Sequence, residues 1–114
     1  MQITLSWPNK LLSPNSRAHW AKRQPFKSAY RNEGYWKAQA LGVELPAIRH
    51  HLKITFYPPT KANRDIDNCL ASIKAGLDGV ADGLAINDRF FRPITIDFAE
   101  TDKKNPRVVI EILA

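Results

Sequence analysis

Hydrophobic residues occupy every second position in four short stretches of the chain. A period of two is typical of β-strands that bury one face, so each stretch is predicted to be a strand. Prolines 58 and 59 end the second stretch, and a polar turn separates the last two. The predicted strands are Met1 to Trp7, Leu52 to Tyr57, Ile94 to Phe98 and Val108 to Ile112.

Two other stretches have the spacing of helices. The first runs from about Arg17 to Leu41, and Asn15 or Ser16 precedes it as a possible N-cap. Pro25 is expected to break or kink its start, and Gly42 is a plausible stop. The second begins after Asp65, where a row at i, i+4, i+7 and i+11 predicts one buried stripe. That row is Ile66, Leu70, Ile73 and Leu77.

The predicted order is β-α-β-α-β-β. It indicates an α+β fold, a two-layer domain in which two helices pack on a mixed four-stranded sheet. A chain of 114 residues has the length of one domain, so we expect a single domain over residues 1–114.

The charge distribution favours a polyanionic partner. The chain carries 17 Lys and Arg against 11 Asp and Glu, a formal charge of +6. From Lys10 to Lys37 the only acid is Glu33. Such local asymmetry is typical of a phosphate-facing surface, although an ordinary solvated face has the same composition.

Nothing in the sequence indicates a membrane or an oxidising compartment. No apolar run reaches the roughly 18 residues that a membrane span needs, and the first residues lack the pattern of a signal peptide. Cys69 is the single cysteine, so an intrachain disulfide is excluded. We therefore expect a cytoplasmic protein.

Acidic residues lie in an unexpectedly basic setting around residue 65. Asp65 and Asp67 flank the start of the second predicted helix, beside Arg64. The simplest reading is a helix cap and a complement to the helix dipole. However, close carboxylates repel each other unless a cation binds between them. Asp88 follows the same helix, and carboxylate oxygens with Asn68 suit a hard divalent ion.

A lysine completes the candidate chemistry. Helical spacing places Lys74 on the same stripe as Asp67, together with Ala71 and Asp78. Carboxylates that bind Mg²⁺, a lysine and a basic groove form a known solution to phosphodiester hydrolysis. Neither a Ser-His-Asp set nor a Gly-rich phosphate loop is apparent in the sequence.

These motifs together resemble the RusA family of Holliday junction resolvases. The resemblance rests on Trp7-Pro8, Pro14 to Arg17, Pro58-Pro59, the segment Asp65-Ile66-Asp67-Asn68, and Asn87-Asp88 about twenty residues later. It implies a Mg²⁺-dependent endodeoxyribonuclease that resolves four-way DNA junctions by paired symmetrical cuts. It also implies a homodimer, and it assigns the metal and the catalysis to Asp65, Asp67 and Asp88.

The sequence departs from the family pattern at two positions. The family lysine falls at Ala71, and we hypothesise that Lys74 takes its role. Asn87 stands where the family often has a further acid. The residues expected to contact nucleic acid are Arg17, Lys22, Arg23, Lys27 and Arg64. Two alternatives stay open: a non-catalytic junction-binding module with a structural divalent ion, and a related nuclease that acts on RNA or flaps.

Overall fold

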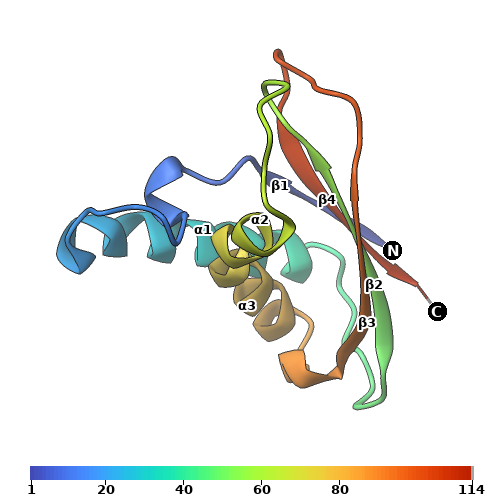
Figure 1. Ribbon diagram of the computed structural model, residues 1–114. Helices are drawn as coiled ribbons and strands as arrows, with labels where there is room; N and C mark the ends of the chain where they lie inside the picture. Colours follow the sequence, from blue (N-terminus) through green and yellow to red (C-terminus); the bar gives the residue numbers. More distant parts are fainter. Residues whose placement is uncertain (114) are drawn as a thin grey trace.

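A computed structural model describes residues 1–113 and has the predicted α+β architecture, in which the helices pack on one side of a mixed four-stranded sheet (Figure 1). The elements in chain order are β1 (Gln2–Ser6), the 3-10 helix η1 (Lys10–Leu12), α1 (Trp20–Gln39), β2 (His50–Tyr57), α2 (Ile66–Ser72), α3 (Lys74–Gly83), the 3-10 helix η2 (Asp88–Phe90), β3 (Phe91–Phe98) and β4 (Arg107–Leu113).

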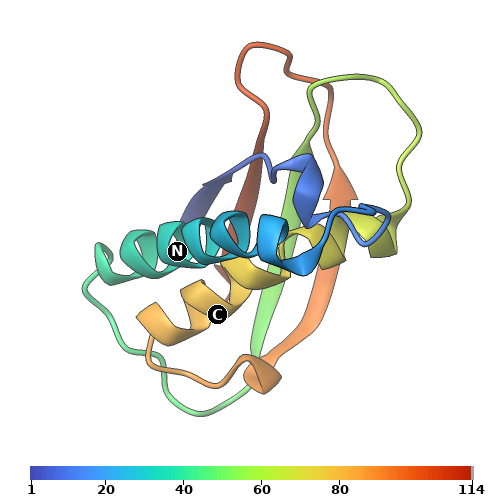
Figure 2. The same ribbon diagram turned by 90° about the vertical axis from the view of Figure 1, so that its left-hand side faces the viewer.

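The sheet has the order β1-β4-β2-β3, so β1 and β3 are its edges. β3 runs parallel to β2, and the other pairs are antiparallel. Because side chains alternate along a strand, each strand turns one row toward the helices. On β2 this row is Leu52, Ile54 and Phe56, all fully buried. The helices cover that face of the sheet and form the second layer (Figure 2).

The first helix begins later than predicted, at Trp20. His19 is its N-cap, and its Nδ1 accepts a hydrogen bond from the backbone N–H of Ala21. Ser16, one of the expected caps, instead accepts from the N–H of Ala18 in the preceding loop. Pro25 lies inside the helix and does not end it. The helix ends at Gln39 with Ala40 as its C-cap, and Gly42 follows two residues later with φ of 66°, a left-handed conformation that favours glycine.

The second helix differs more from the prediction, because it is broken at Ile73. This residue has φ of −100° and ψ of 4°, and it separates α2 from α3. The predicted stripe therefore does not stay on one face. Ile73 and Leu77 are buried, whereas Ile66 is 54% exposed. A stripe calculated for one straight helix was thus wrong for its first turn.

α3 packs closely against α1. At Gly79, an added Cβ would meet the backbone carbonyl of Arg31, and it would lie 3.0 Å from the backbone nitrogen of Tyr35. An added Cβ at Gly34 of α1 would meet the carbonyl of Gly76 in the same way. Glycine at these positions lets the two helix backbones approach, which fixes α3 against the rest of the molecule.

Among the described residues 1–113, no helix is both long enough and apolar enough to cross a membrane.

Candidate active site

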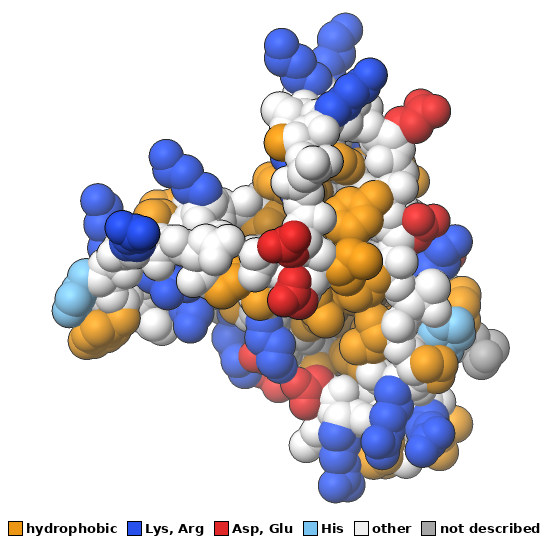
Figure 3. Space-filling view, in the orientation of Figure 1, with side chains coloured by type: hydrophobic (Ala, Val, Ile, Leu, Met, Phe, Trp, Pro, Cys, Tyr) orange, Lys and Arg blue, Asp and Glu red, His pale blue; other side chains and the backbone are white. Residues whose placement is uncertain are grey.

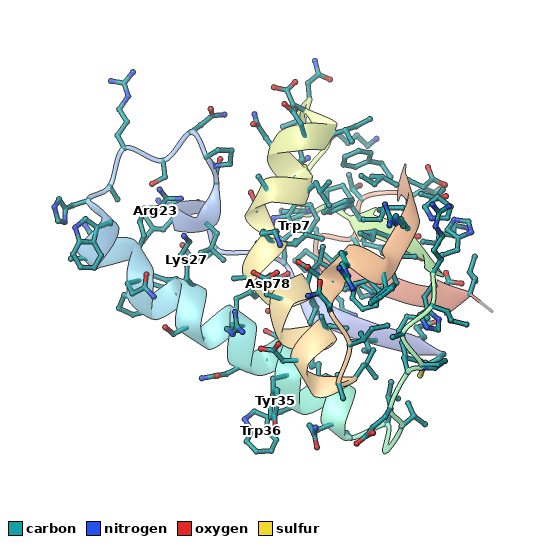
Figure 4. All side chains as sticks on the ribbon, turned by 90° about the horizontal axis from the view of Figure 1, so that it is seen from below. Trp7, Arg23, Lys27, Tyr35, Trp36 and Asp78 are labelled. Atoms are coloured by element: carbon teal, nitrogen blue, oxygen red, sulfur yellow. The ribbon has the colours of Figure 1, made fainter. Side chains whose placement is uncertain are left out.

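A groove of about 650 Å³ lies between the first half of α1 on one side and α2 with the start of α3 on the other. Arg23 and Lys27 reach it from α1, and Asp78 points into it from α3 (Figure 4). The four residues of the polar stripe predicted from helical spacing all line this groove despite the break at Ile73. Its lining residues are Leu12, Pro14, Arg23, Gln24, Lys27, Ser28 and Arg31 on one side, and Asp67, Leu70, Ala71, Ser72, Lys74, Ala75 and Asp78 on the other.

Lys74 joins two carboxylates at one end of the groove. Its Nζ lies 2.6 Å from Oδ1 of Asp78, one turn along α3, and 2.9 Å from Oδ2 of Asp88 in η2. Hydrogen bonds to Asp78 and Asp88 raise the pKa of Lys74, and the hydrogen bond from Lys74 lowers the pKa of Asp88. Both groups therefore stay charged at neutral pH. Lys74 is the link that holds Asp88 beside α3.

Asp65 and Asp67 lie at the start of α2. Asp65 occupies the N-cap position, but its side chain makes no capping hydrogen bond. Its Oδ2 instead accepts a hydrogen bond of 3.2 Å from Nδ2 of Asn68. The simple capping role considered from sequence is therefore wrong for this side chain. Acidic side chains lie exposed over α2 in the space-filling view (Figure 3).

The three predicted carboxylates lie in three different places. Asp67 lines the groove, whereas Asp65 lines a second hollow of about 290 Å³ beside Trp7 and Asn68. Asp88 remains with Lys74. Over residues 1–113, no three His, Cys, Asp or Glu side chains lie close enough together to hold a metal ion. However, Mg²⁺ in phosphate chemistry keeps several waters and often binds one or two protein carboxylates. Asp67, which lines the groove, offers one such carboxylate.

Two of the residues predicted to contact phosphate, Arg23 and Arg64, instead donate hydrogen bonds to backbone carbonyls of the protein. Nε of Arg23 donates to the carbonyl of Leu11 at 2.7 Å, which attaches α1 to η1. Nη1 of Arg64 donates to the carbonyls of Thr60 and Ala62, and its guanidinium lies 5.4 Å from the ring centre of Trp7. The other predicted contacts are exposed; they are Arg17, Lys22 and Lys27.

Sequence reasoning missed two residues of the groove. Asp78 was noted only as part of the polar stripe, yet it contacts Lys74 directly. Its signal was available, since an acid and a lysine four residues apart form a common helical pair. Arg31 lines the groove opposite and forms an ion pair with Asp82 of α3. That pair joins residues 51 positions apart, so no local pattern could reveal it.

Comparison with known proteins identifies a similar protein, but that protein has no assigned function. No protein-family model matches the sequence. An uncharacterized protein from Xylella fastidiosa (strain Temecula1 / ATCC 700964) is 45% identical over 95 residues, which is 78% of this chain and 61% of that protein. The chain thus spans about three-fifths of the length of this relative. The resemblance to the RusA family rests on the motifs alone.

Proposed function

We propose that the protein is a Mg²⁺-dependent endodeoxyribonuclease that cuts four-way DNA junctions in the cytoplasm. One observation carries the proposal. The basic residues of α1 face, across one groove, a wall with Asp67, Lys74 and Asp78. A cationic wall attracts the DNA backbone, and an opposite wall of acids and a lysine suits a reaction at phosphorus.

The basic residues near the start of α1 would position the DNA. Lys22 and Lys27 are exposed on the helix, and Arg17 is exposed in the loop before it. Lysine and arginine side chains bind phosphates without regard to sequence, so they fix the position of the backbone rather than the choice of base. A DNA strand held by Lys27 in the groove would pass close to the wall that carries the acids.

Lys74 is the residue we propose to contact the scissile phosphate. Its ammonium has three N–H donors, and Asp78 and Asp88 accept hydrogen bonds from it. One donor is left for a phosphate oxygen, where it would stabilise developing negative charge. Ala71, at the position of the family lysine, has no polar group. Lys74 is the lysine that lines this second wall of the groove.

Asp65 and Asp67 would hold Mg²⁺, and Asp88 would support them from the end of the groove. When bound, this ion supplies a Lewis acid for the phosphate and lowers the pKa of a water. Asp65 suits such a role because its carboxylate is not used to cap α2. Asn68 holds it in place by a hydrogen bond.

The test is cleavage of an end-labelled four-way junction beside linear duplex, with Mg²⁺ or with chelator. We expect the protein to nick the junction and not the linear duplex, and to do so with Mg²⁺ and not with chelator. Asp67→Asn and Lys74→Ala should each lower the cleavage rate by about a hundredfold or more. The double variant Ala71→Lys/Lys74→Ala asks whether a lysine at the family position restores cutting. Full activity of Lys74→Ala would overturn the role given to this lysine.

A second candidate is a junction-binding module without catalysis. Two observations favour it: Lys74 is engaged by two acids, and the described acids do not gather into a three-carboxylate group. This candidate predicts tight, salt-dependent junction binding by the wild type without nicking in any divalent metal. Binding that persists in Asp67→Asn while nicking disappears would favour the nuclease instead.

A further inference from the structure

The first half of α1 projects from the body of the molecule. Figure 1 shows the start of this helix far from the sheet. The buried residues of α1 all lie in its second half, and none of residues 20–29 is buried. Arg23 supports the projecting part, because its Nε donates a hydrogen bond to the carbonyl of Leu11 next to the body. The start of α1 is therefore an anchored tip that is open to solvent.

An aromatic pair lies at this tip. Trp20 is 69% exposed, and its ring centre lies 5.7 Å from that of His19, with the two rings at 38° to each other. The orientation of the His19 ring is fixed, because its Nδ1 accepts the capping hydrogen bond from Ala21. Figure 3 shows a histidine and hydrophobic side chains at the free end of α1, with Lys and Arg side chains beside them. An indole exposed in this way suits an aromatic ligand, since ring pairs attract each other beyond the effect of area burial.

The tip continues the basic wall of the groove. Residues three and four positions apart lie on the same face of a helix, so Trp20 shares a face of α1 with Arg23 and Gln24. Both of these residues line the groove, and Lys27 lines it one turn later (Figure 4). Trp20 therefore lies at the end of the path along which the proposed function places a DNA strand.

The charge around the tip indicates which kind of aromatic ligand it fits. Arg17 and Lys22 flank the aromatic pair, and both are exposed. The first acid of the chain is Glu33, three turns further along α1. A ligand that is both aromatic and polyanionic is a nucleic acid. A membrane surface fits less well, because a helix bound there buries a whole apolar face, whereas the neighbours of Trp20 on its face of α1 are polar.

We propose that Trp20 stacks on an unpaired base of the DNA, with His19 beside it, while the basic residues of α1 hold the phosphates. This inference rests on the proposed function. In a continuous duplex the neighbouring base pairs cover both faces of every base, whereas a base in a single strand or at an open branch point has a free face for stacking. The tip would thus distinguish the branch point from the arms of a junction, which the basic residues bind alike.

The test is the affinity for DNA, measured by fluorescence anisotropy in chelator so that binding is recorded without cutting. The ligands are a labelled single strand, its linear duplex and a four-way junction. Trp20→Ala should weaken binding to the single strand and the junction by about tenfold, and binding to the duplex by less than about twofold. Trp36→Ala is the matched control, because Trp36 lies on the same helix and is 67% exposed. It should leave all three affinities unchanged.

The salt dependence of binding separates stacking from a phosphate contact. The slope of log affinity against log salt concentration counts the neutralised phosphates, so Trp20→Ala should lower the affinity and leave this slope unchanged. Lys22→Gln should instead reduce the slope by about 0.7 on the single strand. A single strand that contains 2-aminopurine gives a direct readout. Its fluorescence should fall when the wild type binds, because the base stacks on the indole, and should fall much less with Trp20→Ala.

Several results would overturn the role given to Trp20. They are unchanged single-strand and junction affinities in Trp20→Ala, an equal loss on single strand and duplex, and an equal loss with Trp36→Ala. Binding to phosphatidylserine vesicles that Trp20→Ala removes, with DNA binding intact, would assign the tip to a membrane surface instead. A Trp20→Ala variant that binds and cuts junctions like the wild type would overturn the stacking alone. Stacking by Trp20 without cutting by the wild type would overturn the nuclease alone.

Discussion

The two helical segments that carry the second wall of the groove are held in opposite ways. α3 buries six of its residues. Four of them are small, Gly76, Gly79, Ala81 and Gly83, and the other two are Leu77 and Val80. α2 has no buried residue and spans seven residues. A helix this short is marginal unless packing supports it. Lys74 and Asp78 thus lie on the firmly held segment, and Asp67 lies on the weakly held one.

This difference indicates how the candidate site is divided. Elements with few buried contacts open locally at low free energy, whereas the core opens only with global unfolding. We therefore expect the Lys74–Asp78–Asp88 cluster to keep its geometry, because α3 is fixed against α1. Asp65 and Asp67 can adjust more readily when a ligand binds, since α2 is attached to the core only through the partly buried Cys69 and Leu70 among its hydrophobic side chains.

The largest expected effect comes from breaking the close helix pair. Gly79→Ala would drive a methyl group into the carbonyl of Arg31, so α3 must move away from α1. Overpacking against backbone cannot be relieved by a rotamer change, and we expect a loss of about 3 kcal/mol or more in unfolding free energy. Chemical denaturation measured by circular dichroism would give the value.

Gly42→Ala is the control for that substitution. Gly42 has φ of 66° but open space around the position of a Cβ. Its cost should be only that of the left-handed backbone, about 1–2 kcal/mol. Equal losses at Gly42 and Gly79 would mean that the contact between α1 and α3 is not tight.

A smaller effect is expected where α1 is attached to the sheet. Glu33 accepts hydrogen bonds of 2.6 Å from both the N–H and the hydroxyl of Ser6 on β1, and one of 3.0 Å from Lys37. Burial raises the pKa of Glu33, but the hydrogen bonds from Ser6 and Lys37 outweigh it, and the net pKa is lowered. Glu33→Gln should cost about 1–2 kcal/mol at neutral pH.

The pH dependence of the unfolding free energy distinguishes the contribution of the Glu33 carboxylate charge from that of side-chain packing. Because the folded pKa of Glu33 is lowered, the unfolded chain takes up the proton first as pH falls. The stabilisation is present above the ordinary value of 4.5 and is lost as pH falls through the lowered folded pKa. Glu33→Gln should therefore lose less stability than the wild type on acidification. Parallel curves for the two proteins would contradict this. Glu44→Gln, at an exposed position, is the control.

The sequence predicted the sheet better than the helices, for a physical reason. Strand alternation is set by one buried face, and all four strands lie where the period of two indicated. The break at Ile73 depends on how α3 packs against α1, which local spacing does not contain. The acids were identified by type and spacing. Their division between α2 and the Lys74 cluster depends on contacts distant in sequence, such as Lys74 with Asp88.

The smallest expected effect tests α2 itself. Ala71 of α2 and Ala29 of α1 are both exposed, so replacing either by glycine changes helix propensity and little packing. Ala29→Gly should cost about 1 kcal/mol in unfolding free energy, the usual difference between the two residues. Ala71→Gly should cost less than about 0.5 kcal/mol, because the loss cannot exceed the small stability that α2 has of its own. Faster amide hydrogen exchange in α2, with α3 unchanged, should accompany Ala71→Gly. An equal cost at the two positions would mean that α2 unfolds only with the whole domain, and that the Asp67 side of the groove is held as firmly as the Lys74 side.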